Sequence, residues 1–166
     1  MSNAKTLSKK LKRIKLLLLD VDGVLTDGGI FYSGLGVEMK RFNAHDGYGA
    51  VRAREHGLKL AIISGRQTPI VDVRAKEMGI EDVMQNASDK VAAMEEVRRR
   101  HGIQTDEVAF IGDDLFDLSL LNTVGFSAAP RNALPEVRRA VDFVTKASGG
   151  DGAVRELIDM IIKNRG

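Results

Sequence analysis

Cysteine is absent from the 166 residues of the chain, and aromatic residues make up only 5% of them. Without cysteine, the protein can form neither disulfide bonds nor thiolate metal sites. No apolar run approaches the ~20 residues that a membrane-spanning helix needs, and the N-terminus lacks the apolar core of a signal peptide. We therefore expect a cytoplasmic protein that has no membrane as a partner.

A large excess of charge of one sign is also missing, because the formal net charge is only +2. Such a small charge gives no reason to expect nucleic acid as a partner. Basic residues gather at 9–15 and 98–100, where solvated helix faces or a frayed tail explain them. The hydrophobic content of 43% is ordinary for a soluble globular protein, and we expect residues 1–166 to form a single domain. Residues 1–6 are expected to be a tag remnant or disordered.

The run Leu16–Leu19 is typical of a short strand that is buried on both faces. It ends at two carboxylates, Asp20 and Asp22, which Gly23 follows. In open α/β sheets, binding sites lie at the carboxyl ends of the strands. Two carboxylates this close repel each other, so we expect a cation or a shared proton to hold them there. A strand that ends in an ordinary solvated turn is the alternative interpretation.

Strands and helices alternate along the rest of the chain. Apolar runs predict strands at 58–63, around residue 83, and at 108–111, 126–128 and 143–144. Helix signals predict helices at 46–56, 69–79, 89–101, 116–123, 135–140 and 154–163, with Thr68 and Ser88 as N-caps, and a short basic helix or tail at 5–15. This alternation predicts an α/β fold, a three-layer α/β/α Rossmann-like sandwich with a central parallel sheet.

One segment interrupts the alternation, since residues 28–42 predict a β-hairpin insertion. Its middle, Ser33-Gly34-Leu35-Gly36, has turn residues and lies between two segments of alternating or apolar character. An isolated hairpin is only marginally stable in water. Its apolar side chains therefore need a covering surface, for which a neighbouring subunit is one candidate.

Polar groups of complementary chemistry follow the predicted strands. They are Asp20 and Asp22 after the first strand, Ser64, Gly65 and Arg66 after the second, Lys90 at a helix start, and Asp113 and Asp114 after a later strand. Because parallel strands all end at one edge of the sheet, these groups can converge. The carboxylates fit a hard cation such as Mg²⁺, whereas the hydroxyl, the lysine and backbone N–H groups fit a phosphate. Ordinary explanations are helix caps for the serine and the later aspartates, and a surface position for the lysine.

The motifs Asp-x-Asp-Gly-Val, Ser-Gly-Arg, the lysine and Gly-Asp-Asp-x-x-Asp occur in the order in which the haloacid dehalogenase superfamily of phosphatases carries them. From residue 15 onward, the chain resembles this superfamily. The resemblance implies that Asp20 is the nucleophile and Asp22 the general acid/base, and that Ser64 and Lys90 hold the transferring phosphoryl group.

The same resemblance implies a Mg²⁺ site. Asp113 would bind the ion together with the Asp20 carboxylate and the Asp22 backbone carbonyl, while Asp114 would support these ligands from behind. With this ion and the lysine, the repulsion between a dianionic phosphate and an attacking carboxylate would be cancelled.

Only the hairpin stands where other members of the superfamily carry a cap domain, so the chain resembles the capless branch. That branch implies a homotetramer in which hairpins pack together and a neighbouring subunit helps to cover each active site. It also implies an acidic sugar phosphate as substrate. In that branch, the enzyme for the eight-carbon acid carries arginine at the place of Arg66, whereas the enzyme for the nine-carbon acid tends to carry glutamate. The resemblance therefore implies 3-deoxy-D-manno-octulosonate 8-phosphate, in lipopolysaccharide biosynthesis, as the substrate, and the phosphate of a nine-carbon keto-deoxy acid is the alternative. A non-catalytic oligomerisation module is an alternative of another class.

Four further residues are candidates for binding the substrate. Arg66 can pair with a sugar carboxylate, or it can hydrogen-bond carbonyl groups of its own loop. Arg155 is a second candidate for the sugar acid or for a neighbouring active site, and its alternative is a surface position on a helix. Asn43 and Asp46 are candidates for contacts with substrate hydroxyl groups, although Asp46 also fits a helix cap.

Overall fold

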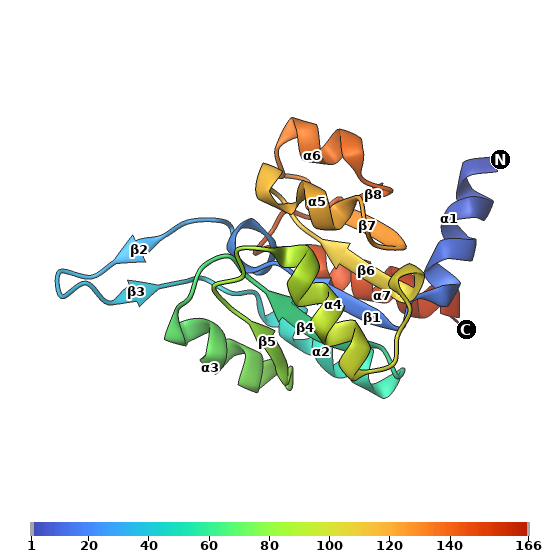
Figure 1. Ribbon diagram of the computed structural model, residues 1–166. Helices are drawn as coiled ribbons and strands as arrows, with labels where there is room; N and C mark the ends of the chain where they lie inside the picture. Colours follow the sequence, from blue (N-terminus) through green and yellow to red (C-terminus); the bar gives the residue numbers. More distant parts are fainter. Residues whose placement is uncertain (1, 166) are drawn as a thin grey trace.

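The computed structural model describes residues 2–165 of the chain. At its centre lies a sheet of six parallel strands in the order β5-β4-β1-β6-β7-β8, with helices on both faces (Figure 1). The strands are β1 (Leu16–Leu19), β4 (Lys59–Ile63), β5 (Asp82–Met84), β6 (Val108–Ile111), β7 (Phe126–Ala129) and β8 (Phe143–Val144). The predicted three-layer α/β/α sandwich is confirmed.

The four leucines of β1 are wholly buried and pair with β4 on one side and β6 on the other. A strand with apolar side chains on both faces is stable only if both faces of the sheet are covered. Leu17 and Leu19 point into one hydrophobic core, and Leu16 and Leu18 into the second core on the opposite face. This central position carries the two aspartates that follow β1 to the middle of the sheet edge.

Helices from different parts of the chain build the two outer layers. One core includes side chains from α1 (Ser2–Arg13), α2 (Ala44–Glu55), α3 (Pro69–Met78) and α7 (Ala153–Arg165), and the other includes side chains from α4 (Lys90–Arg100), α5 (Leu118–Leu121) and α6 (Pro135–Ala140). Among residues 2–165, no helix has the length and apolar character to cross a membrane. That residues 1–6 are a tag remnant or disordered stays a prediction. In the structure α1 begins at Ser2, and Met1 lies outside the described residues.

Two details of the sequence prediction are wrong. Asp89, and not Ser88, caps α4, because its carboxylate accepts hydrogen bonds from the N–H groups of Val91 and Ala92. The single helix predicted at 116–123 is divided into a 3₁₀ turn, η3 (Leu115–Asp117), and the short α5. The division arises because the Asp117 carboxylate turns back to accept hydrogen bonds from the backbone before η3.

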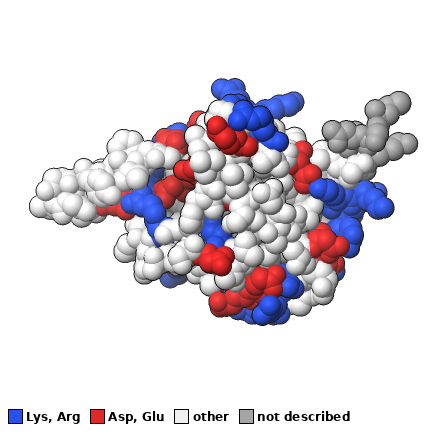
Figure 2. Space-filling view, turned by 45° about the horizontal axis from the view of Figure 1, so that its top comes forward, with Lys and Arg blue, Asp and Glu red and all other residues white. Residues whose placement is uncertain are grey.

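The predicted hairpin is present as β2 (Phe31–Tyr32) and β3 (Glu38–Met39), which pair only with each other. It projects away from the sandwich (Figure 1). Its large apolar side chains are exposed, namely Ile30, Phe31, Tyr32, Leu35, Val37 and Met39. In Figure 2, the projecting end of the hairpin is free of charged side chains on the visible face. The hairpin therefore presents an uncovered apolar surface to the solvent.

Candidate active site

A cavity of about 290 Å³ opens at the carboxyl ends of β1, β4 and β6. It is lined by Asp20, Asp22, Gly23, Gly28, Ser64, Gly65, Arg66, Lys90, Asp113, Asp114, Phe116 and Asp117. All eight residues that were predicted from the strand ends are in this list. Parallel topology alone explains the convergence, because the groups lie on loops that leave the same edge of the sheet.

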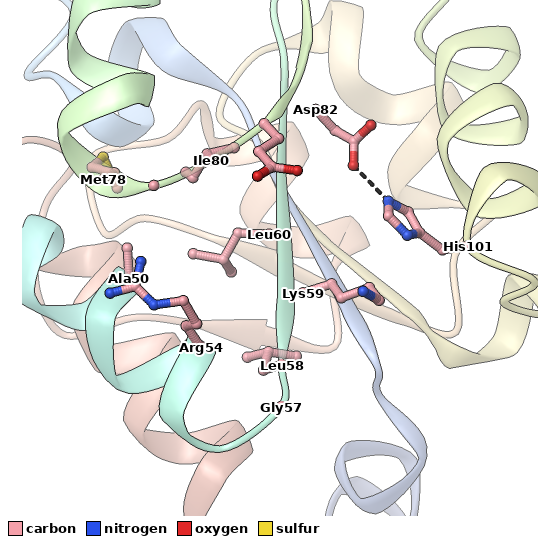
Figure 3. Close-up of a pocket in the computed structure, with 12 residues that line it drawn as sticks. Ala50, Arg54, Gly57, Leu58, Lys59, Leu60, Met78, Ile80, Asp82 and His101 are labelled. Atoms are coloured by element: carbon pink, nitrogen blue, oxygen red, sulfur yellow. Dashed lines mark hydrogen bonds and ion pairs between the residues drawn. The ribbon is translucent and has the colours of Figure 1, made fainter.

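A second cavity of about 260 Å³ lies at the amino end of β4, and Figure 3 shows it in close-up. Arg54 and Leu60 are among its lining residues, and the Nε2 atom of His101 lies 2.5 Å from an Asp82 oxygen at its rim. None of the residues predicted to carry chemistry lines this cavity. The cavity at the carboxyl ends is therefore the candidate active site.

Lys90 lies between two buried carboxylates at the base of the site. Its Nζ atom is 2.9 Å from Asp20 Oδ1 and 2.6 Å from Asp117 Oδ1. Only 3% of Lys90 is exposed, so it is not a surface lysine. Burial alone would lower the pKa of Lys90, but the two carboxylates raise it and keep the ammonium charged. Lys90 is thus a fixed positive charge beside the predicted nucleophile.

The site holds more negative charge than Lys90 neutralises. Burial, followed by the charge of Asp117, raises the pKa of Asp20 despite the opposing effect of Lys90. Burial, followed by the charges of Asp117 and Asp114, raises the pKa of Asp113 to about 7. Carboxylates that resist ionisation in this way are stabilised when a cation joins them.

The residues present fit a divalent metal ion. Carboxylate oxygens of Asp20, Asp113 and Asp117 lie within 4.8 Å of one another, and oxygen ligands of this kind suit Mg²⁺. Gly23 leaves the space that this arrangement needs, since a Cβ atom there would overlap the Asp113 carboxylate. Asp20 and Asp113 were predicted as ligands, and the structure brings them together. That the Asp22 backbone carbonyl is a further metal ligand stays a prediction.

The Asp22 side chain points to a different partner. It forms an ion pair with Lys40, whose side chain is fully buried, and Arg66 Nη1 lies 3.8 Å from its other oxygen. Lys40 also lies 2.8 Å from an oxygen of Glu38 on β3. The predicted acid/base is thereby held by the hairpin as well as by the strand that precedes it.

The loop after β4 forms the opposite wall. The buried Ser64 hydroxyl accepts a hydrogen bond from the Arg66 N–H and so does not cap a helix. A Cβ atom at Gly65 would lie 3.0 Å from the Phe116 ring. The backbone of the loop therefore packs closely beside Phe116 at the wall of the cavity.

Three predicted substrate contacts do not line the cavity of this chain. Asn43 caps α2 and donates to the Gly150 carbonyl, and Asp46 accepts from the Arg155 N–H. Arg155 pairs with Asp159 at 2.7 Å and lies over the Tyr48 ring. All three therefore have structural partners that join α2 to the start of α7. Their part in substrate binding stays a prediction.

Sequence reasoning gave no role to two groups of the site. The first is Asp117, the last residue of the motif Gly-Asp-Asp-x-x-Asp. The sequence suggested no role for it, but the structure shows that it binds Lys90. The Asp114 carboxylate instead accepts from the Leu115 N–H at the start of η3, and its predicted support of the metal stays a prediction. Lys40 had no signal at all, because a lone lysine on a short strand is ordinarily a solvated residue.

Comparisons with known proteins agree with this geometry. A model of the haloacid dehalogenase-like hydrolases matches residues 68–157. The 3-deoxy-D-manno-octulosonate 8-phosphate phosphatase KdsC of Escherichia coli strain K12 is 40% identical over 157 residues, which are 95% of this chain and 84% of the relative.

Two solved structures are also similar. The 3-deoxy-D-manno-octulosonate 8-phosphate phosphatase from Moraxella catarrhalis, in complex with a magnesium ion, a phosphate ion and KDO, has a TM-score of 0.93 and 41% identity, covering 96% of this chain and 91% of that chain. The cobalt-bound deoxy-D-mannose-octulosonate 8-phosphate phosphatase from Haemophilus influenzae has a TM-score of 0.91 and 37% identity, covering 95% of this chain and 92% of that chain. The family model spans more than half of this chain and the relatives nearly all of it, so the chain belongs to the haloacid dehalogenase-like hydrolases.

Proposed function

We propose that the protein is a Mg²⁺-dependent phosphatase that hydrolyses 3-deoxy-D-manno-octulosonate 8-phosphate to the free sugar acid and phosphate, in lipopolysaccharide biosynthesis. The observation that carries this proposal is the cavity in which the buried Asp20 contacts Lys90 and belongs to a carboxylate cluster that fits a metal ion, with Arg66 at its wall. Relatives that match nearly the whole chain bear the name of this phosphatase, which supports the choice of substrate.

In the proposed first step, a carboxylate oxygen of Asp20 attacks the phosphorus atom. The bond between phosphorus and the sugar oxygen breaks, and an aspartyl phosphate forms. Lys90 is close enough to Asp20 to neutralise charge on the transferring group, and the Ser64 hydroxyl can donate to a phosphoryl oxygen. A bound Mg²⁺ ion supplies further positive charge for the phosphoryl oxygens.

Asp22 serves both steps from the same wall of the cavity. It gives a proton to the departing sugar oxygen, and it then takes a proton from the water that attacks the aspartyl phosphate. That attack breaks the bond between Asp20 and phosphorus, releases inorganic phosphate and restores the nucleophile. The contact with Lys40 gives Asp22 a fixed orientation, and the negative charge of the bound phosphate beside Asp20 favours the protonated form of Asp22 that the first step needs.

We further propose that the protein is a cytoplasmic homotetramer. Several large apolar side chains exposed together, as on the hairpin, mark an interaction site. A second copy of the chain would cover this surface and would exclude water from the reaction. Phe116, which lines the cavity and is about half exposed, would be covered in the same way.

The test is phosphate release with Mg²⁺ from the eight-carbon and the nine-carbon acid phosphates, compared by kcat/KM. A clear preference for the eight-carbon substrate supports the proposal. Equal or reversed preference would leave a phosphatase but would remove the substrate assignment. Absence of activity on both compounds and on aryl phosphates would instead favour a non-catalytic oligomerisation module.

A further inference from the structure

A network of four alternating charges runs along the base of the hairpin into the active site. Arg66 Nη2 donates to Glu38 Oε2 at 3.3 Å, and Glu38 Oε1 lies 2.8 Å from Lys40 Nζ. Lys40 in turn pairs with Asp22. Two members of this network, Glu38 and Lys40, come from the hairpin, and the other two come from loops of the sheet edge. The hairpin therefore forms part of the site wall.

The two middle members of this network are shielded from water. The Lys40 side chain has no exposed surface, and that of Glu38 is only 14% exposed. Lys40, above all by donating a hydrogen bond, lowers the pKa of Glu38 and keeps it a carboxylate. A shielded ion pair of this kind has a defined geometry, and removal of one partner is costly. Glu38 is therefore a rigid support for Arg66.

The two terminal nitrogens of Arg66 differ in their surroundings. Nη2 binds Glu38 and lies 3.4 Å from the Tyr32 hydroxyl. Nη1 is buried and makes no hydrogen bond, since the Asp22 oxygen 3.8 Å away is beyond hydrogen-bond distance, and Arg66 lines the cavity. Because buried guanidinium N–H groups are almost always paired, Nη1 needs an acceptor that the chain does not place within hydrogen-bond distance. An anionic group of a ligand in the cavity is such an acceptor.

We propose that Glu38 is a positioning residue for Arg66, and that it orients the guanidinium group so that Nη1 receives the carboxylate of an acidic sugar phosphate. Lys40 fixes Glu38, and Tyr32 completes the support from the other strand of the hairpin. This inference rests on the proposed function, because it requires a substrate that carries a carboxylate as well as a phosphate. It gives the hairpin a part in substrate selection within its own subunit.

The test compares Glu38→Gln with the wild type on two substrates, the eight-carbon acid phosphate and p-nitrophenyl phosphate, which has no carboxylate. For the acid phosphate, KM should rise by about tenfold, in line with the loss of a hydrogen bond to a charged group, while kcat changes by less than about twofold. Both constants for p-nitrophenyl phosphate should stay within about twofold. Glu38→Asp, which keeps the charge, should recover part of the loss. Glu95→Gln removes a glutamate that pairs with Arg98 on α4, and it serves as the matched control.

Equal losses on both substrates would overturn the proposal, because Glu38 would then support the site as a whole. A lower KM for the acid phosphate would also overturn it, because Glu38 would then compete with the substrate for Arg66. Binding of the free eight-carbon sugar acid, measured by calorimetry, separates this proposal from the proposed function. If the wild type fails to hydrolyse the acid phosphate, the proposed function is wrong, whereas unchanged affinity of Glu38→Gln for the sugar acid contradicts the role of Glu38 alone.

Discussion

Three ionisable groups share one buried space at the end of β1. Lys90 contacts both Asp20 and Asp117, and Asp117 also accepts hydrogen bonds from the N–H groups of Asp113 and Asp114. Asp117 therefore fixes the loop that carries Asp113 and, at the same time, the lysine beside the proposed nucleophile Asp20. Removal of such a residue would disturb the positions of several groups at once, which is the usual cause of non-additive effects in active sites.

We predict that Asp20→Asn abolishes turnover while the protein stays folded. Asparagine has the same shape, and Lys90 keeps Asp117 as its partner, but the amide cannot attack phosphorus. The rate of phosphate release should fall by more than about 10³-fold. Thermal unfolding and oligomeric size serve as controls, and retained turnover in a folded variant would show that Asp20 is not the nucleophile.

The sequence allowed the prediction of those site residues whose place follows from topology. Asp20, Ser64 and Asp113 each follow a buried strand, and parallel strands bring such residues to one edge. Lys40 and Glu38 could not be found in this way, because their role depends on how a short hairpin folds back against the sheet. Side-chain partners across such a fold are set by packing, which spacing along the chain does not reveal.

At the scale of single elements, a glycine-rich loop supports the turn after β1. Gly150 donates to the Val24 carbonyl, and Gly149 lies so close to the turn that a Cβ atom would overlap the Gly23 carbonyl oxygen. The loop precedes α7, whose residues Leu157 and Ile158 pack in the same core as β1. The position of the catalytic turn therefore depends on the last helix.

We predict that Gly149→Ala lowers both stability and activity. The added methyl group must displace either the loop or the turn, and overpacking of this kind costs about 1–3 kcal/mol. The melting temperature should fall, and kcat should fall with it because Asp22 moves with the turn. The control is Gly34→Ala, because a Cβ atom there meets no atom within 4 Å, and both quantities should stay unchanged. Gly57→Ala is not suitable as a control because Gly57 has a positive φ. Wild-type behaviour of Gly149→Ala would contradict the contact.

A second prediction at this scale concerns the hairpin. Val37→Ser together with Leu35→Ser should weaken or abolish the oligomer, since these side chains are exposed and apolar. Light scattering coupled to size exclusion gives the mass. Val73→Ser on α3 is the matched control, because Val73 and Val37 are both 59% exposed and only Val37 lies on the hairpin. A wild-type protein that is a stable monomer would refute the proposed assembly.

Element boundaries could be predicted where a local signal determines them. The proline at the start of α3 and the left-handed Gly79 at its end are such signals, and α6 begins at a proline as well. The division of the predicted helix at 116–123 could not be foreseen. It depends on Asp117, whose carboxylate binds the backbone of the preceding loop instead of solvent.

For the whole molecule, buried carboxylates and Lys90 gather at the carboxyl ends of the strands. The metal-free fold therefore includes a cluster of carboxylates that resist ionisation. A carboxyl group whose pKa is higher in the folded than in the unfolded protein favours folding at low pH, and this contribution is lost as the pH rises through the folded pKa. Asp113, with its pKa raised to about 7, is such a group.

We predict that Mg²⁺ stabilises the protein more at about pH 8.5 than at about pH 6, because the ion must displace a proton from the cluster at the lower pH. The measurement is the melting temperature with excess Mg²⁺ and with a chelator at each pH. The gain should grow with Mg²⁺ concentration as expected for a ligand of the folded state. Asp113→Asn is expected to lose most of this gain. A gain that does not depend on pH would contradict the carboxylate site.

The hairpin has consequences that extend beyond a single chain. Under the two proposals above, its base positions Arg66 and its exposed apolar tip contacts a second copy, so this hairpin would link the state of assembly to the choice of substrate. Dilution below the dissociation constant of the oligomer would remove the neighbours that hold the hairpin in place. KM for the acidic substrate would then increase as the enzyme becomes scarcer. The abundance of the protein in the cell would thus help to set its selectivity.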